Sequence, residues 1–186
     1  MVRAILLLCF SVLFTWNTYP QSWCPPGATW TYGTDAFGLF GYQQYSYVGD
    51  SVIGGLNGQR ITGHGAMSYF GQSQVDYWSD TIGFVTALDG DVIVIWNAND
   101  QDWDTLFWLG ASPGDGWLRR NGPYGSCDPR DSLVVVDTSV VVFDGLSLRQ
   151  WTVQQHWAGG TNWGQNFTER LGWDSSFEPF PACLIV

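Results

Sequence analysis

The sequence predicts an all-β fold, an antiparallel sandwich, barrel or half-barrel built from consecutive hairpins. Three observations support this prediction. After the N-terminal segment, apolar residues recur with a period of two. No long segment shows the spacing of apolar residues that is typical of an amphipathic helix. Turn-forming residues interrupt the chain about every 8–12 residues. The segments between these turns are rich in β-branched and aromatic side chains, which are favoured in strands.

The segment Trp151–Trp157 shows the alternation most clearly. It places Trp151, Val153 and Trp157 on one face and polar side chains on the other, as in a half-buried strand. Two further segments, Val92–Trp96 and Leu133–Val136, are apolar at every position. We expect both to form strands that are covered on two sides and that supply the core.

Glycine, aspartate and asparagine mark the chain reversals, because glycine adopts positive φ freely and the other two tolerate it. The strongest hairpin prediction joins Phe84–Leu88 to Val92–Trp96 through Asp89-Gly90. The remaining predicted turns lie at Val48–Asp50, Gly54–Gly58, Asn97–Asp102, Ser112–Gly116, Asp144-Gly145 and Ala158–Asn162.

The chain begins like an export signal. Arg3 precedes Ala4–Trp16, an apolar or neutral run of 13 residues. Such a run is too short to span a bilayer, which takes about 20 apolar residues. We expect residues 1–22 to be a signal peptide and residues 23–186 to be one secreted β domain. The chain stops on the apolar residues Leu184–Val186, an ending that a truncated gene product would also show. The mature chain is predicted to have no membrane span and to be secreted or held at the cell surface.

Charge excludes one class of partner. The chain has 15 Asp, 2 Glu, 7 Arg and no Lys, for a net charge of −10. Proteins that bind nucleic acid contact phosphates mainly through Lys and Arg, so we expect no nucleic-acid partner.

Three cysteines remain after the signal. Disulfides form in an oxidising compartment, but three cysteines cannot all pair within one chain. Either one thiol is free, or its partner lies on a part of the protein that this chain lacks. If one intrachain disulfide forms, the favoured pair is Cys127 with Cys183, although spacing does not fix the connectivity.

The sequence offers little sign of metal or cofactor chemistry. His64 and His156 are far apart, and neither belongs to a zinc-binding motif. The segment Asp100–Asp104 alternates carboxylates as calcium loops do, but Thr105 stands where such loops need glycine. We interpret it as an acidic, solvated turn, and we expect no metal and no cofactor.

Catalysis is an alternative that the residues leave open. A glycan hydrolase needs two placed carboxylates, and the two glutamates, Glu169 and Glu178, are the first candidates. Glu169 lies in a strand-like stretch beside Arg170, where a cross-strand ion pair is an ordinary structural role. We therefore favour a protein without catalytic residues.

Aromatic residues give the remaining functional hint. Trp157 and Trp163 flank a glycine-rich loop that ends at Asn162, where rings can stay exposed. Tyr42, Tyr45 and Tyr47 form a second strip. Aromatic rings also fill β-sheet cores, and this is the commoner role for any single ring. The candidate ligand surface comprises Trp157, Asn162, Trp163 and Tyr45.

Six stretches in order resemble a domain found repeatedly in secreted proteins of Bacteroidota-type bacteria, where it usually precedes a type IX secretion sorting domain. These stretches are Pro26–Tyr32, Gly41–Ile61, Trp103–Arg119, Val136–Arg149, Thr168–Gly172 and Phe180–Cys183. The resemblance covers most of the mature chain and implies an exported β-rich module with no catalytic residues to carry over. Similar proteins continue past the position of Cys183 into another cysteine, which the resemblance implies as its partner.

These observations favour a non-catalytic extracellular binding or structural module. The expected partner is an extracellular glycan or a surface protein. The alternatives are a carbohydrate-binding module that uses exposed Trp and Tyr rings, and a glycan hydrolase that uses a carboxylate pair.

Overall fold

The computed structural model describes residues 23–36, 38–71, 73–80, 83–119, 131–157, 160–161 and 164–174. Within these residues the regular structure consists of strands, and all strand pairs are antiparallel, which confirms the predicted fold class. The predicted signal peptide, residues 1–22, lies outside this part of the chain. The strands are β1 (Thr29–Ala36), β2 (Leu39–Ile53), β3 (Leu56–Tyr69), β4 (Asp76–Ser79), β5 (Phe84–Asp89), β6 (Val92–Asn97), β7 (Asp102–Trp108), β8 (Gly116–Arg119), β9 (Asp131–Phe143), β10 (Leu146–Trp157), β11 (Gly160–Thr161), β12 (Gln165–Thr168) and β13 (Gly172–Trp173).

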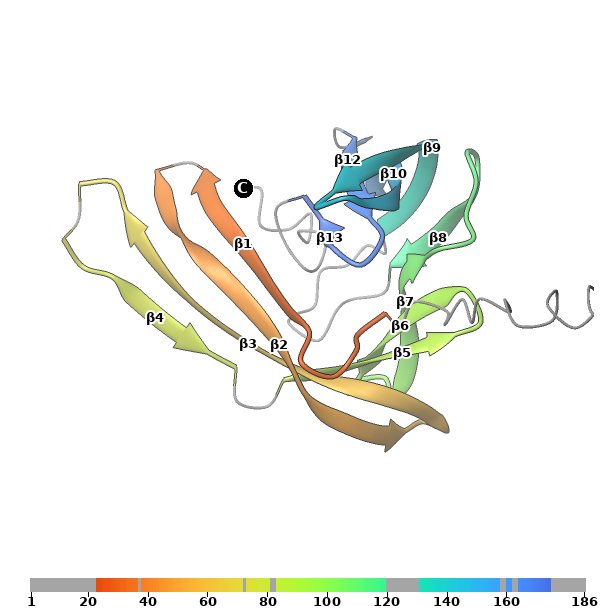
Figure 1. Ribbon diagram of the computed structural model, residues 1–186, viewed down its shortest axis with the longest axis horizontal. Helices are drawn as coiled ribbons and strands as arrows, with labels where there is room; N and C mark the ends of the chain where they lie inside the picture. The colour runs from red at the N-terminus through yellow and green to blue at the C-terminus, as the bar shows by residue number, and fades with distance from the viewer. Residues whose placement is uncertain are drawn as a thin grey trace, which may run out of the picture.

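The first sheet has the order β1-β2-β3-β5-β6-β7 and curves as a half-barrel (Figure 1). One edge of the long strand β3 is shared, because β5 pairs with its first half and β4 with its second half. In Figure 1 the end of this sheet that carries β4 reaches away from the second sheet. The sheet therefore packs against its partner over only part of its length.

The second sheet has the order β13-β12-β10-β9-β8, and β11 pairs with the end of β10. The long β9–β10 hairpin forms its centre. Two-residue turns of the expected chemistry close the longest hairpins of both sheets. Asp144-Gly145 closes β9–β10 with φ values of 49° and 80°, and Gly54-Gly55 closes β2–β3 with 52° and 81°. Left-handed conformations at both turn positions define the turn that best matches strand twist, which explains the local sequence.

The β5–β6 hairpin forms as predicted, but its turn lies one residue further along the chain than the predicted Asp89-Gly90. Asp89 pairs with Val92, so the loop consists of Gly90 and Asp91. Ile93, Val94 and Ile95 are all buried although they alternate between the two faces of β6. The prediction of a strand covered on both sides is therefore confirmed for this segment.

Strand β9 departs from the same prediction. Leu133 and Val135 are buried, but Val136 is 41% exposed. The register explains the difference. Val153 pairs with Val135 and Thr152 with Asp137, which leaves Val136 as the extra residue of a β-bulge. One face of β9 therefore supplies the core at this point, and the bulge turns Val136 outward.

Stacked aromatic rings join the two sheets. Phe107 of β7 lies parallel to Phe167 of β12, with ring centroids 4.1 Å apart, and Trp151 of β10 stacks on the other side at 5.0 Å from Phe167. Trp23 packs edge-on against Phe107 at 5.4 Å. Offset and edge-to-face aromatic contacts contribute roughly 0.5–1.5 kcal/mol each beyond the area they bury. The core is thus an aromatic layer between the sheets.

Strand β10 alternates as predicted. Trp151 and Val153 are buried on the inner face, while Thr152 and His156 are half-buried on the outer face. Gln155 shares the inner face and is only 2% exposed, which the sequence pattern did not indicate.

Candidate functional site

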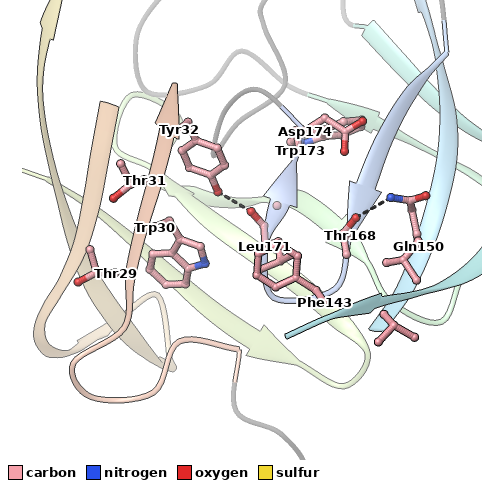
Figure 2. A pocket seen from close by; sticks show the side chains of 13 residues that line it. Thr29, Trp30, Thr31, Tyr32, Phe143, Gln150, Thr168, Leu171, Trp173 and Asp174 are labelled. Atoms are coloured by element: carbon pink, nitrogen blue, oxygen red, sulfur yellow. Dashed lines mark hydrogen bonds between the residues drawn. The ribbon is translucent and has the colours of Figure 1, made fainter. Parts of the chain in front are cut away.

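A cleft of about 660 Å³ opens between β1 of the first sheet and β9, β10, β12 and β13 of the second (Figure 2). Binding sites for small ligands typically measure about 300–1,000 Å³ and combine apolar walls with a few polar groups. The cleft has that composition. Its described lining consists of Thr29, Trp30, Thr31, Tyr32, Val141, Val142, Phe143, Gln150, Thr168, Leu171, Gly172, Trp173 and Asp174.

Strand β1 forms the first wall. Among the described residues it pairs only with β2, so its other edge borders the cleft. The residues alternate along the strand, with Trp30 and Tyr32 pointing to the core and Thr29 and Thr31 exposed. Because the cleft runs along the strand edge, the wall contains both kinds of side chain.

Two hydrogen bonds hold this wall against the second sheet. The Trp30 indole Nε1 donates to the carbonyl oxygen of Arg170 at 2.6 Å, and the Tyr32 hydroxyl donates to that of Leu171 at 2.5 Å. Both acceptors lie in the turn between β12 and β13, where Arg170 has a positive φ of 66°. These bonds hold the two walls of the cleft together; the bond from Tyr32 to Leu171 is the dashed line between these residues in Figure 2.

The opposite wall comes from the second sheet. Gln150 of β10 donates its Nε2 to the Thr168 hydroxyl of β12 at 2.9 Å, as the dashed line in Figure 2 shows. Phe143 lies at the end of β9 and is 53% exposed. This wall therefore offers an amide and an accessible aromatic ring, while the buried Thr168 hydroxyl holds the amide in place.

Strand β13 and the residue after it complete the site. Trp173 is almost fully buried and packs against Phe107 and Phe167, so it belongs both to the core and to the cleft lining. Asp174 is exposed, and its Oδ2 accepts a 3.0 Å hydrogen bond from the Asn166 amide. Asp174 is the carboxylate of the described lining.

Burial raises the pKa of the cleft phenol. Desolvation first, and the neighbouring Tyr45 second, raise the pKa of Tyr32 far above its ordinary value. A phenol is already neutral at physiological pH, and the raised pKa keeps Tyr32 a hydrogen-bond donor further into the alkaline range. The chemistry available is hydrogen bonding by hydroxyl, amide and carboxylate groups beside flat apolar rings.

Tyr45 does not lie on an open surface. Its ring packs edge-on against Tyr32 at 6.1 Å and Phe84 at 6.0 Å, and its hydroxyl donates to Gln43. Tyr45 and Tyr47 pack against the core, whereas Tyr42 is 40% exposed. The strip of three tyrosines is therefore split, because positions 42 and 45 fall on opposite faces of a strand.

The other sequence-predicted site residues cannot be placed in the cleft. The backbone of Trp157 ends β10, but its side chain lies outside the described part of the structure. Asn162, Trp163, Glu178 and both cysteines of the candidate disulfide, Cys127 and Cys183, also lie outside the described residues.

Glu169 has a structural contact. It is half-buried in the turn between β12 and β13, and its Oε2 accepts a 3.3 Å hydrogen bond from the backbone N–H of Arg149. This contact links the turn to β10. It differs from the cross-strand ion pair that the sequence suggested beside Arg170.

The acidic segment after β6 forms the predicted turn, with one difference. Asn97 organises it: its Nδ2 donates to Asp100 and Asp104, each at 3.0 Å, and its Oδ1 accepts from the backbone of Asn99 at 3.0 Å. Asp104 is 4% exposed, so the expectation of a fully solvated segment was wrong for this residue. No group of three or more potential metal ligands occurs among the described residues.

Cys24 is a free thiol that is only 2% exposed. Desolvation first, and the Asp50 carboxylate second, raise the pKa of this thiol from 9.0 to about 12. A buried, protonated thiol is chemically inert.

In the described ranges, the structure contains no helix long and apolar enough to cross a membrane.

The cleft itself was missed at the sequence level. The alternation of threonine with aromatic residues at positions 29–32 could have indicated a strand with one aromatic face. The meeting of β1 with the β12–β13 turn joins residues 140 positions apart, and no local signal marks it.

Comparison with protein-family models, with curated proteins and with solved structures finds no match to this chain.

Proposed function

We propose that this chain is a non-catalytic extracellular module that binds the end of an uncharged glycan in the cleft between β1 and the second sheet. One observation carries the proposal: the cleft places the exposed ring of Phe143 beside hydroxyl, amide and carboxylate side chains in a space of suitable volume, with the buried rings of Trp30, Tyr32 and Trp173 in its lining. Sugars present an apolar C–H face and a rim of hydroxyl groups. A site for them therefore needs flat rings and paired donors and acceptors.

The hydrogen bonds already present support a preorganised site. The donors of Trp30 and Tyr32 are bound to backbone carbonyls, so these rings are held in place before a ligand arrives. Preorganisation lowers the entropy lost on binding. The exposed side chains of Thr29, Thr31 and Asp174 lie at the rim. They are bonded to Ser46, Gln44 and Asn166, and their remaining hydrogen-bonding capacity can meet sugar hydroxyl groups.

Charge favours an uncharged ligand. The cleft lining contains Asp174 and no cationic side chain among its described residues. The chain as a whole carries a net charge of −10 and no lysine. Sulfated and uronate-rich glycans would meet electrostatic repulsion, which reduces the rate at which they associate.

The experiment is a glycan array probed with the purified chain and with two variants. Phe143 and Leu146 oppose each other in the register and are 53% and 50% exposed, but only Phe143 lines the cleft. Phe143→Ala should weaken binding at least tenfold, a loss of about 1.4 kcal/mol. Leu146→Ala should bind as the unmodified chain does.

Three results would overturn the proposal: no glycan bound by the unmodified chain, equal losses in both variants, or release of reducing sugar that Glu169→Gln or Glu178→Gln abolishes. The last result would instead establish the carboxylate-pair hydrolase.

A further inference from the structure

A row of three side chains crosses the outer face of the first sheet at the end that carries β4. Tyr42 of β2 pairs with Ala66 of β3, and Ala66 pairs with Tyr77 of β4. Residues in register across neighbouring strands point to the same face of a sheet. The two tyrosines therefore stand on one face with a methyl group between them.

This face is open to solvent. Tyr42 is 40% exposed and Tyr77 is 79% exposed, whereas Ala66 is only 8% exposed because a tyrosine lies on each side of it. The ring of His64 meets the Tyr42 ring edge-on, with centroids 6.3 Å apart and an interplanar angle of 89°. That contact restricts the orientation of Tyr42 on an otherwise open surface.

Packing of the core does not account for the two tyrosines. The inner face of the same strands is filled by Tyr45 and Trp78, whose ring centroids are 6.5 Å apart. Glycines make room for them: a Cβ at Gly63 would lie 2.9 Å from Tyr45, and one at Gly65 would lie 2.6 Å from Trp78. The aromatic rings that pack together in this part of the sheet lie on its inner face. The rings of Tyr42 and Tyr77 lie on the outer face and take no part in that packing.

We infer that Tyr42 and Tyr77 form a second, flat binding site, the tyrosine platform, for an uncharged polysaccharide chain of β-linked pyranose units. This inference rests on the proposed function and assigns to the module a chain-binding surface separate from the cleft. The chain would run across β2, β3 and β4, with sugar faces against the two rings and with Ala66 beneath it.

The spacing of the rings suits such a chain. Neighbouring strands lie about 4.7–4.9 Å apart, so the backbone positions of Tyr42 and Tyr77 are separated by roughly 10 Å. This distance is comparable with the length of a disaccharide unit in an extended β-1,4-linked polymer. Two sugars of one chain, separated by one other unit, can therefore contact the two rings. The side chain of Ala66 between the rings is too small to obstruct the polysaccharide chain.

Charge again restricts the ligand. Asp35 and Asp76 are exposed on strands at this end of the sheet, and the net charge of the chain is −10. Interactions between exposed charges extend over about 8–10 Å at physiological salt. An anionic polymer lying on the platform would come within reach of these carboxylates, whereas an uncharged polymer would not be repelled.

The test is co-sedimentation of the full chain with three insoluble uncharged polymers: cellulose, β-1,4-xylan and chitin. We expect retention on at least one of them. Tyr42→Ala and Tyr77→Ala should each lower the affinity at least tenfold. Tyr42→Phe, which keeps the ring, should retain most of the affinity of the unmodified chain. Tyr69→Ala is the matched control, since Tyr69 is 49% exposed on β3 but falls on the opposite face from Ala66.

The outcomes separate the platform from the cleft. Retention that survives Phe143→Ala but not Tyr42→Ala or Tyr77→Ala supports the platform. If Phe143→Ala removes retention and the tyrosine variants do not, the platform is overturned while the proposed function stands. Failure of the chain to sediment with any of the three polymers, or an equal loss in Tyr69→Ala, also overturns the platform.

Discussion

The hydroxyl group of Tyr32 donates a 2.5 Å hydrogen bond to the carbonyl oxygen of Leu171, and this bond joins an edge strand of one sheet to a turn of the other. Its neighbour Trp30 makes the equivalent bond to Arg170. The cleft therefore owes its width to contacts between segments that are distant in sequence and that do not pair as strands in the described structure.

Tyr32→Phe removes the hydroxyl and preserves the ring. We expect it to lower the free energy of unfolding by about 1 kcal/mol, because the carbonyl of Leu171 loses its buried donor. If the proposed cleft binds a glycan, affinity should fall as well, since the wall is no longer fixed. Urea denaturation and titration of the array ligand measure the two effects.

Tyr69→Phe is the control for this change, because the Tyr69 side chain is 49% exposed. Removing the exposed hydroxyl of Tyr69 should leave the free energy of unfolding and the glycan affinity unchanged. Equal stability of the Tyr32→Phe and Tyr69→Phe variants would contradict the assigned role of the Tyr32 hydroxyl.

Arg149 of β10 connects the second sheet to the segment that follows β7. Its guanidinium donates to the carbonyl oxygens of Leu109 and Ala111, each at 3.1 Å, and lies 4.9 Å from the centroid of the Trp151 ring. Arg149→Met keeps the apolar stem but leaves both carbonyls without this donor. We expect a loss of about 1–3 kcal/mol in the free energy of unfolding.

Denaturation of Arg149→Met beside Arg60→Met tests this assignment. Arg60 is exposed on β3, so its replacement should change stability by less than about 0.5 kcal/mol. Arg149→Lys should fall between the unmodified chain and Arg149→Met, because an ammonium group cannot donate two bonds in the fixed geometry of a guanidinium. Identical curves for all variants would show that the guanidinium contacts contribute nothing.

Local signals explain how much of the fold could be predicted. The turns at Gly54-Gly55 and Asp144-Gly145 were identifiable because left-handed backbone requires these residue types. The period of two identified strands such as β6 and β10. The bulge at Val136 was not identifiable, because it depends on how β9 pairs with β10 and not on the composition of β9.

The candidate site, unlike the turns and strands, could not be predicted from local signals. The cluster of tyrosines at positions 42–47 predicts that Tyr45 lies on the surface, yet strand alternation separates it from Tyr42 and directs it toward Phe84. The wall formed by Trp30 could not be anticipated from sequence, since its partner Arg170 is 140 residues away. Composition indicates that aromatic rings are abundant, but only the register shows which of them remain exposed.

Gly145, in a hairpin turn, and Gly33, in β1, both have room for a Cβ but differ in the sign of φ. A Cβ at either position would meet no atom within 4 Å, but Gly145 has a φ of 80° whereas the φ of Gly33 is not positive. Gly145→Ala should therefore destabilise the chain by about 1–2 kcal/mol through left-handed strain. Gly33→Ala should be neutral or slightly stabilising, because alanine restricts the unfolded chain.

Thermal and urea unfolding of the two alanine variants measure this difference. Because Asp144-Gly145 closes the hairpin that carries Phe143, strain in the turn should also disturb the rim of the cleft. Equal stability of the two variants would show that the turn adopts another conformation in solution.

The buried thiol of Cys24 makes stability depend on pH in the alkaline range. Burial, with a contribution from Asp50, raises its pKa from 9.0 to about 12, so the folded thiol keeps a proton that the unfolded thiol releases. Between these values the unfolded state binds fewer protons, and the free energy of unfolding must fall as the pH rises; below the lower value this contribution is fully present. Urea denaturation from about pH 8 to about pH 11 should therefore give a steeper decline for the unmodified chain than for Cys24→Ala, which lacks the titrating group. Parallel declines would mean that Cys24 ionises as readily in the folded chain as in the unfolded one, and would place its side chain in contact with water.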